Sequence, residues 1–281
     1  MNELKKEHIE KLKERARELR NLTLDMCVKA GTGHVTSSFS CAEIMAVLYF
    51  GGIMRHNPKD PKWNERDRFI LSKGQASPIL YATLADAGYF SKEWLETFCK
   101  KDGKFGVHLQ NDVPGVEISS GSLGHGLGIA TGMALAAKMD KKKYFTFVLL
   151  GDGELYEGSN WESAMVANQY NLNNLIAIVD RNWQCATNFT EESIKLNPID
   201  KKFQAFGWET KIINGHSIEG ILDSLEGFRS IKRDGPYVII AETIKGKGSP
   251  YIESQVMWHA RAPTQEEAKI VKKEINEKYG D

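Results

Sequence analysis

Two polar residues that follow apolar runs have the types and the spacing of a cation-binding pair. Asp152 lies in the run Gly-Asp-Gly at 151–153, and Asn182 lies 30 residues further along the chain. A carboxylate and an amide oxygen, completed by backbone carbonyls and phosphate oxygens, form a hard-oxygen ligand set that suits Mg²⁺ or Ca²⁺. Gly151 and Gly153 would let the backbone approach a diphosphate that a Cβ would obstruct. The pattern therefore predicts a site for a metal and a diphosphate; the other interpretation is two ordinary turns.

The elements on either side of these residues can bring them together. Residues 144–150 (YFTFVLL) and 175–179 (LIAIV) are short apolar runs that predict buried strands, and residues 161–168 between them predict a helix. Parallel strands joined by a helix open their carboxyl ends on the same crevice, where open α/β sheets bind ligands. We therefore expect Asp152 and Asn182 to share one ion.

Strand and helix patterns alternate along the rest of the chain. Helices are expected over residues 4–30, 41–50, 78–87 and 126–137, and strands near 69–71, 210–213 and 237–241. This order predicts an α/β fold with a doubly wound, mostly parallel sheet flanked by helices, in a single domain over residues 1–281. The small residues Gly124, Gly126, Gly128, Gly132 and Ala134 would permit close approach of a helix, either at a subunit interface or inside the domain.

Composition and charge favour an intracellular protein. Lys plus Arg and Asp plus Glu both number 37, so no net field favours nucleic acid or an anionic membrane. No apolar run approaches the ~20 residues of a membrane span, and the charged start of the chain does not resemble a secretory signal. Cys27, Cys41, Cys99 and Cys185 are widely spaced, which suits reduced thiols. We expect a cytoplasmic protein with neither nucleic acid nor a membrane as its partner.

Five ordered segments resemble the thiamine diphosphate enzymes, and among these the transketolases most closely. The segments are Gly33-His34, residues 67–74 (DRFILSKG), residues 114–117 (PGVE) with 121–124 (GSLG), residues 151–158 (GDGELYEG) with Asn182, and residues 245–248 (KGKG) with Trp258-His259. The resemblance extends over roughly residues 10–270. It implies a thiamine diphosphate-binding domain of the diphosphate type.

The resemblance assigns the cofactor and its metal to particular residues. Asp152, Asn182 and the backbone carbonyl of Gln184 match the ligands of Mg²⁺, for which Ca²⁺ or Mn²⁺ could substitute. The residues that match cofactor contacts are Gly121, Ser122, Leu123, Gly151, Gly153, Glu154, Asn182 and His259. Glu157 matches a glutamate at the subunit interface, near the partner's catalytic glutamate; otherwise it is an ordinary exposed acid.

Three histidines match those that line the transketolase substrate channel: His34, His108 and His259. Cleavage of the bond between C2 and C3 of a ketose requires a base for the C3 hydroxyl and donors for the developing oxyanion, and neutral imidazole can serve as either. The surroundings of His108 depart from the family pattern, since its neighbours are Val107 and Leu109. His8, His56 and His216 are expected to be solvated or satisfied within the core.

Gln75 stands where the family has a histidine after Ser-X-Gly. A glutamine can donate and accept hydrogen bonds, but it cannot act as a base near neutral pH. The substitution therefore marks either an altered donor or acceptor sugar or neutral drift. Lys245, Lys247 and Arg261 could reach an anionic cofactor or substrate, or they could be solvated loop charges.

The resemblance also predicts a partner. Transketolases continue beyond the part that this sequence matches with a pyrimidine-binding domain, which carries a catalytic glutamate, and with a third domain. We therefore expect the N-terminal subunit of a split transketolase, inactive alone, which transfers a two-carbon ketol unit between sugars or sugar phosphates. Its expected partner is the C-terminal transketolase subunit, in a heterotetramer of two plus two. The alternatives are a subunit of another thiamine diphosphate enzyme, of the keto-acid dehydrogenase or deoxyxylulose-phosphate-synthase type, and a noncatalytic module with the same fold.

Overall fold

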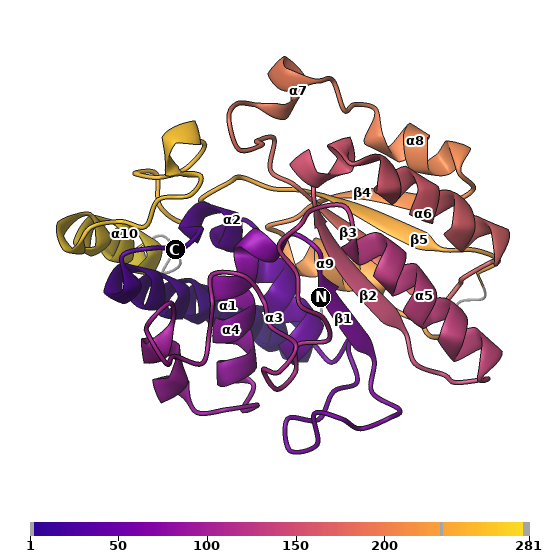
Figure 1. The fold of residues 1–281 in the computed structure, drawn as a ribbon, viewed down its shortest axis with the longest axis horizontal. Helices are drawn as coiled ribbons and strands as arrows, with labels where there is room; N and C mark the ends of the chain where they lie inside the picture. The colour runs from indigo at the N-terminus through magenta and orange to yellow at the C-terminus, as the bar shows by residue number, and fades with distance from the viewer. Residues whose placement is uncertain (1–2, 231–232, 278–281) are drawn as a thin grey trace.

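A five-stranded sheet with helices on both faces forms the centre of the molecule in a computed structural model, which describes residues 3–230 and 233–277 (Figure 1). The strands are β1 (Arg68–Leu71), β2 (Thr146–Gly151), β3 (Leu175–Arg181), β4 (Glu209–Asn214) and β5 (Tyr237–Glu242). Their order is β1-β2-β3-β5-β4, and every pairing is parallel. The expected doubly wound parallel sheet is confirmed.

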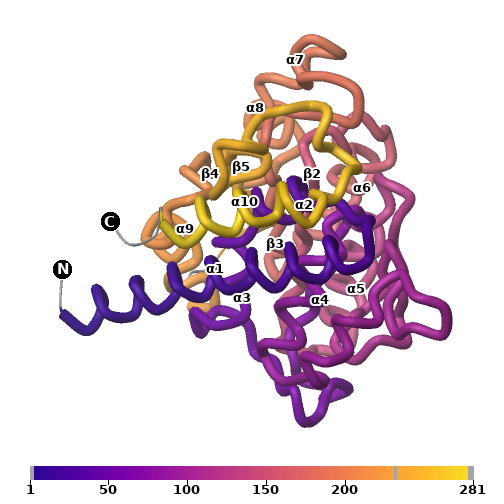
Figure 2. The backbone as a smooth tube through the Cα atoms, turned by 90° about the vertical axis from the view of Figure 1, so that its left-hand side faces the viewer, coloured from indigo at the N-terminus to yellow at the C-terminus, as the bar shows by residue number. Residues whose placement is uncertain are grey.

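The predicted helices are also found, with ends that move by a few residues. They are α1 (Glu3–Ala30), α3 (Ala42–Phe50), α4 (Ser77–Asp86), α5 (Gly126–Met139) and α6 (Gly158–Gln169). The structure adds α2 (Val35–Phe39), α7 (Thr190–Ser193), α8 (Ile199–Ala205), α9 (Ile218–Leu225) and α10 (Gln265–Glu277), none of which was predicted. Figure 2 shows α10 lying alongside α1. The prediction of one domain over residues 1–281 stays a prediction.

Alternating strand residues build two separate cores. On one face of the sheet, residues such as Phe147, Leu149 and Ile178 pack against α1, α3, α4, α9 and α10. On the other face, Val148 and Leu150 pack against α5, α6 and α8. Strands that are covered on both faces of a parallel sheet have continuous apolar sequences, because neither face meets water. This is why β2 and β3 could be predicted from the sequence.

The register of β2 and β3 sets the position of the candidate metal ligands. Gly151 pairs with Asp180 at the carboxyl ends of the two strands. Asp152 and Asn182 therefore leave the same edge of the sheet from neighbouring strands, as the spacing predicted. No helix in residues 3–230 and 233–277 is long and apolar enough to cross a membrane.

The small residues of α5 lie on two different sides of the helix. Gly126 and Ala134 face inward, and a Cβ on Gly126 would lie 2.2 Å from the Ser72 hydroxyl oxygen. Gly128 and Gly132 face outward and are exposed. One side of the helix is thus tightly packed inside the domain, while the other is open to a further chain.

Candidate active site

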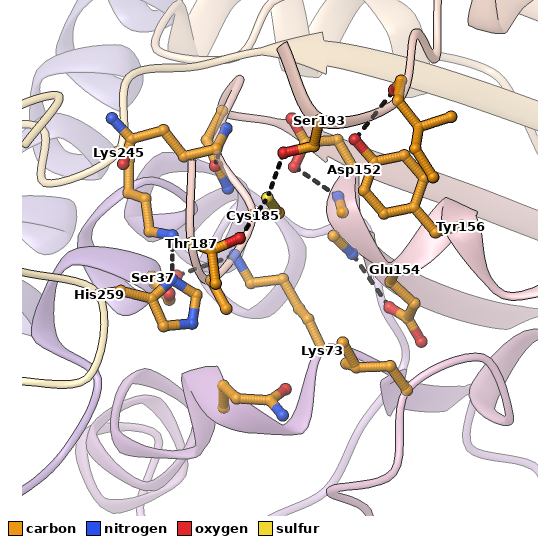
Figure 3. A pocket seen from close by; sticks show the side chains of 18 residues that line it. Ser37, Lys73, Asp152, Glu154, Tyr156, Cys185, Thr187, Ser193, Lys245 and His259 are labelled. Carbon is orange, nitrogen blue, oxygen red and sulfur yellow. Dashed lines mark hydrogen bonds between the residues drawn. The ribbon is translucent and has the colours of Figure 1, made fainter. Parts of the chain in front are cut away.

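A cavity of about 460 Å³ opens at the carboxyl ends of β2 and β3. Figure 3 shows Lys245 and His259 on the left of the cavity lining, Asp152 on the right, and Lys73 and Cys185 between them. Its lining includes most of the residues selected from the sequence, namely Gln75, Leu123, Gly151, Asp152, Gly153, Glu154, Asn182, Gln184 and His259. A volume of this size lies in the range of ~300–1,000 Å³ that is usual for small-molecule sites.

Asp152 is buried, and protein groups hold its carboxylate on both sides. Oδ1 accepts a hydrogen bond from the Gly153 N–H at 2.8 Å, and Oδ2 accepts hydrogen bonds from the Trp183 N–H at 2.6 Å and from Nη1 of Arg181 at 3.1 Å. Burial raises the pKa of Asp152 to about 6, although the Arg181 charge opposes this rise. Since a carboxylate oxygen has two lone pairs, Oδ1 remains able to bind a cation.

The Asn182 side chain has a defined orientation. Its Nδ2 donates a hydrogen bond to Oδ2 of Asp180 at 3.2 Å, and its Oδ1 accepts one from the Gln184 N–H at 3.2 Å. Gln184 is 3% exposed, and neither polar atom of its side chain has a partner within the described residues. The segment from 182 to 184 thus places one amide side chain in a fixed orientation beside one unsatisfied amide.

The two glycines of the Gly-Asp-Gly run differ in how much space surrounds them. A Cβ on Gly153 would lie 3.1 Å from Cβ of Cys185, so this position is closed by the loop that crosses it. A Cβ on Gly151 would make only an ordinary contact of 3.5 Å with Cβ of Lys73. The approach of protein backbone therefore explains Gly153, whereas nothing within the described chain requires glycine at 151.

Glu154 links two parts of the cavity wall. Its carboxylate accepts hydrogen bonds from the Gly124 N–H at 2.9 Å, from the Gly151 N–H at 3.1 Å and from the Ser72 hydroxyl. Burial raises the pKa of Glu154, and these hydrogen bonds oppose the rise. The Glu154 carboxylate therefore joins the end of β2 to the 121–124 loop. Its partners are two backbone N–H groups and one hydroxyl group.

The 121–124 loop packs directly on His108. A Cβ on Gly121 would lie 2.9 Å from the His108 ring, so glycine permits this approach. Ser122 is exposed and Leu123 half-buried; of the two, Leu123 lines the cavity. Gln75 also contacts this loop, since its Nε2 donates a hydrogen bond to the carbonyl of Gly121 at 3.1 Å. Gln75 thus has its amide oxygen left to face the cavity.

His34 and His259 lie edge to face, with ring centroids 5.6 Å apart. His34 precedes α2 and follows Gly33, whose φ of +121° favours glycine. Burial, reinforced by the neighbouring His108 and Lys245, lowers the pKa of His34 to about 4. Burial and the adjacent Lys245 likewise lower the pKa of His259 to about 4. Both rings are therefore neutral at physiological pH.

Lys245 holds one nitrogen of His259. Its Nζ lies 2.6 Å from Nδ1 of His259, and because an ammonium can only donate, Nδ1 accepts and the ring proton lies on Nε2. Lys245 is 2% exposed, and burial lowers its pKa to about 8. Of the three basic residues left open from the sequence, it is the one that lines the cavity; Lys247 pairs with Glu253 and Arg261 with Glu267.

Two predicted residues lie at the margin of the site. Glu157 is exposed at the start of α6, and its side chain makes no capping hydrogen bond there. It lies against Gly124, where a Cβ would be 2.5 Å from Cβ of Glu157. His108 lies behind Gly121 and outside the lining of the cavity. Two further histidines behave as expected: His56 bonds to the Tyr49 carbonyl and His216 to Glu43.

Three buried charged residues beside the cavity were not selected from the sequence. Lys73 and Asp180 form an ion pair, and Arg181 pairs with both Asp152 and Glu191. Asp180 and Arg181 were read only as part of a turn, but they are the last residues of β3. The available signal was their position, because charged residues that end an apolar run lie at the ligand-binding edge of a parallel sheet.

The donor groups present fit a hard divalent cation and an anionic cofactor. The described residues contain no group of three or more His, Cys, Asp or Glu side chains that could hold a metal. This agrees with a ligand set of one carboxylate, one amide oxygen and one carbonyl, completed by phosphate oxygens. Gln184, which lines the cavity, has a buried side-chain amide without a partner in the described residues. Such a group is costly unless a ligand satisfies it.

Comparison with known proteins identifies the class. Residues 12–280 match the family described as transketolase, thiamine diphosphate binding domain. The chain belongs to the transketolase family and contains its thiamine diphosphate-binding domain. The match favours a transketolase over the other thiamine diphosphate enzymes considered above.

Particular relatives define the similarity further. The chain is 40% identical over 272 residues to an apulose-4-phosphate transketolase subunit of Phocaeicola vulgatus, covering 96% of this chain and 95% of that one. It is 39% identical over 270 residues to a 6-deoxy-6-sulfo-D-fructose transketolase subunit of a Clostridium species, covering 96% and 97%. The transketolase of Campylobacter jejuni superposes with a TM-score of 0.89 at 35% identity; the match covers 96% of this chain but 42% of that longer one.

Proposed function

We propose that this chain is the diphosphate-binding subunit of a two-chain transketolase, which moves a two-carbon ketol unit from a ketose to an aldose. The observation that carries the proposal is the convergence of Asp152, Asn182 and His259 on one cavity, with the His34 ring against that of His259, in a chain of the transketolase family. Relatives of nearly equal length are named as transketolase subunits. This supports an enzyme divided between two chains.

The cation of this site is proposed to be Mg²⁺, with Ca²⁺ or Mn²⁺ as substitutes. Asp152 Oδ1, Asn182 Oδ1 and the Gln184 carbonyl are the oxygens that would hold it, and Gly151, where a Cβ would make only an ordinary contact with protein atoms, leaves room for a diphosphate. Thiamine diphosphate, when bound, supplies the nucleophilic carbon and the electron sink that cleavage of a carbon–carbon bond beside a carbonyl requires. The Lys245 ammonium, which lines the same cavity, adds a positive charge there.

His34 and His259 are proposed to handle the protons and hydroxyls of the sugar. Both rings are neutral because their pKa values lie at about 4, so each carries a proton on one nitrogen only. His259 presents Nε2–H as a donor, since Nδ1 faces Lys245. A neutral imidazole can take the C3 hydroxyl proton, and the donor can stabilise the developing oxyanion. His108 and Glu157 are proposed as further members of the site.

The partner is proposed to be a chain that carries the pyrimidine-binding domain, in a heterotetramer of two plus two. Large apolar side chains are exposed on α5, on α6 and just after it, at Ile129, Met139, Met165, Val166 and Tyr170. Gly128 and Gly132 of α5 are exposed as well. Exposed apolar surface of this kind marks an interaction site. The four free cysteines suit the reducing cytoplasm, which we propose as the location.

The experiment that tests the function combines the two chains with thiamine diphosphate, Mg²⁺, a ketose phosphate and an aldose phosphate. Ketol transfer should require both chains. Asp152→Asn should abolish the transfer while leaving the fold unchanged. Asp223→Ala removes an exposed carboxylate that pairs with Lys5 and is the matched control. Undiminished turnover of the Asp152 variant would refute the proposed site.

Gln75 is proposed to contribute to the choice of sugar. The relatives are named for apulose-4-phosphate and for 6-deoxy-6-sulfo-D-fructose, so sugars differ within this group of proteins. Gln75 lines the cavity and is fixed by the Gly121 carbonyl. Gln75→His should change the ratio of kcat/KM values among several ketose donors, including these two. An unchanged profile would leave neutral drift as the explanation.

A further inference from the structure

The carboxylate of Asp180 gathers side chains from four separate segments beneath the cavity. Oδ2 accepts hydrogen bonds from the Ser40 hydroxyl at 2.6 Å, from the Lys73 ammonium and from Nδ2 of Asn182 at 3.2 Å. Oδ1 accepts a hydrogen bond from the Thr243 hydroxyl. Asp180 itself is fully buried at the end of β3. Its carboxylate therefore makes contacts only within the protein.

These contacts decide which end of the Asn182 amide is presented to the cavity. An amide has one oxygen and one NH₂ group, and only the oxygen can bind a cation. Because the carboxylate of Asp180 can only accept hydrogen bonds, it attracts the NH₂ group and leaves Oδ1 on the opposite side. The Gln184 N–H, which donates to Oδ1, selects the same orientation. Asp180 also accepts the Asp152 N–H through its backbone carbonyl at 3.2 Å.

Lys73 keeps Asp180 in this role. Its ammonium pairs with the carboxylate and is held from the other side by the Ser37 carbonyl at 2.8 Å. The carboxylate thus accepts hydrogen bonds from the side chains of Ser40, Lys73, Asn182 and Thr243, which hold it within this cluster.

We propose that Asp180, with Lys73 as its counter-charge, is a positioning residue that fixes the Asn182 amide so that its oxygen faces the cation of the cofactor site. The inference rests on the proposed function, because that function places a cation there. It adds to the site the residues that contact a proposed metal ligand without binding the cation themselves. Groups in this layer around a metal typically change its affinity by about 10- to 100-fold when they are removed.

Two double variants of equal charge test the role directly: Lys73→Met with Asp180→Asn, and Lys73→Met with Asp180→Leu. Both remove the buried ion pair, which apolar replacements of similar volume often tolerate without loss of stability. Asparagine keeps an acceptor oxygen for Asn182, whereas leucine of nearly the same shape does not. Mn²⁺ binding to the full chain with saturating thiamine diphosphate and the partner chain is measured by electron paramagnetic resonance, and thermal unfolding is followed in parallel.

The leucine variant should bind Mn²⁺ about tenfold or more weakly than the asparagine variant. Ser40→Ala, which removes a different hydrogen bond to the same oxygen, should change the affinity by less than about threefold. Equal affinities in two folded double variants would overturn the positioning role. Asn182→Ala separates this failure from that of the proposed function: if it too binds Mn²⁺ normally, the cation site itself is wrong.

Discussion

The carboxyl group of Asp152 should make the stability of the cation-free chain fall as the pH rises. Burial raises its pKa from 3.8 to about 6, so the folded chain holds this proton more tightly than the unfolded chain does. For a carboxyl group with a raised pKa, the stabilising contribution is complete below the unfolded value and is lost as the pH rises to the folded value. The window of change therefore runs from 3.8 to about 6.

The size of the effect follows from the two pKa values. Each pH unit between them corresponds to about 1.36 kcal/mol, so the free energy of unfolding should fall by about 3 kcal/mol across the window. This loss is what remains after Arg181, whose Nη1 lies 3.1 Å from Oδ2, has offset part of the cost of burial. A divalent cation at Oδ1 would stabilise the ionised carboxylate further, so saturating Mg²⁺ and thiamine diphosphate should largely abolish the fall.

The comparison of the native chain with Asp152→Asn isolates this group, because the other titrating residues are shared. Urea unfolding is measured for both proteins between about pH 4 and 7, once with a chelator and once with Mg²⁺ and thiamine diphosphate. The difference between the two free energies should change with pH only when the cation is absent. Parallel curves for the two proteins under chelation would contradict the assignment of a raised pKa to Asp152.

Three further substitutions have distinct expected outcomes. A side chain at position 132 would meet open space within this chain. Gly132→Gln should therefore leave the unfolding free energy unchanged or raise it by up to about 1 kcal/mol. It should weaken assembly with the partner, which light scattering measures. Gly121→Ala would place a Cβ 2.9 Å from the His108 ring and should lower kcat/KM for ketol transfer about tenfold or more, because small displacements in a site are costly. Lys245→Met removes a charge 2.6 Å from Nδ1 of His259, so the pKa of His259, followed by its ring proton signals in nuclear magnetic resonance, should rise above about 4. Burial, the larger cause of the shift, remains and should keep it below the usual 6.5.

The fold was accessible from the sequence because its strongest signals are local. Strands β2 and β3 are covered on both faces and therefore stand out as uninterrupted apolar runs, and their parallel pairing follows from the helix between them. Five helices were missed. Among them, α9 and α10 lie in a part of the chain for which only the strands and a catalytic motif were considered, although their apolar residues do pack in the core.

The site was accessible only where a motif or a strand end marked a residue. Asp152 and Asn182 could be paired because each follows a strand, and the family resemblance supplied the histidines. The contact of Lys73 with Asp180 could not be predicted in this way, since the two residues lie 107 positions apart and neither is unusual in its own segment. Arg181 was hidden for a related reason: its partners Asp152 and Glu191 flank it at separations of 29 and 10 residues. Buried charges are paired by the fold, and sequence alone does not disclose the pairing.

The exposed margin of the site gives a physical reason for the proposed partner chain. Asp152, Asn182 and Lys245 are buried within this chain, whereas Ser122, His125 and Glu157 on the neighbouring loops are open to solvent. Water at this margin would weaken every electrostatic interaction that the buried residues make with a bound ligand, because charges attract less strongly in a high dielectric. A partner that covers the margin would exclude this water and leave the buried groups as they are. On this view the chain provides the buried, fixed groups of the site. Catalysis would depend on assembly because only the assembled site excludes water.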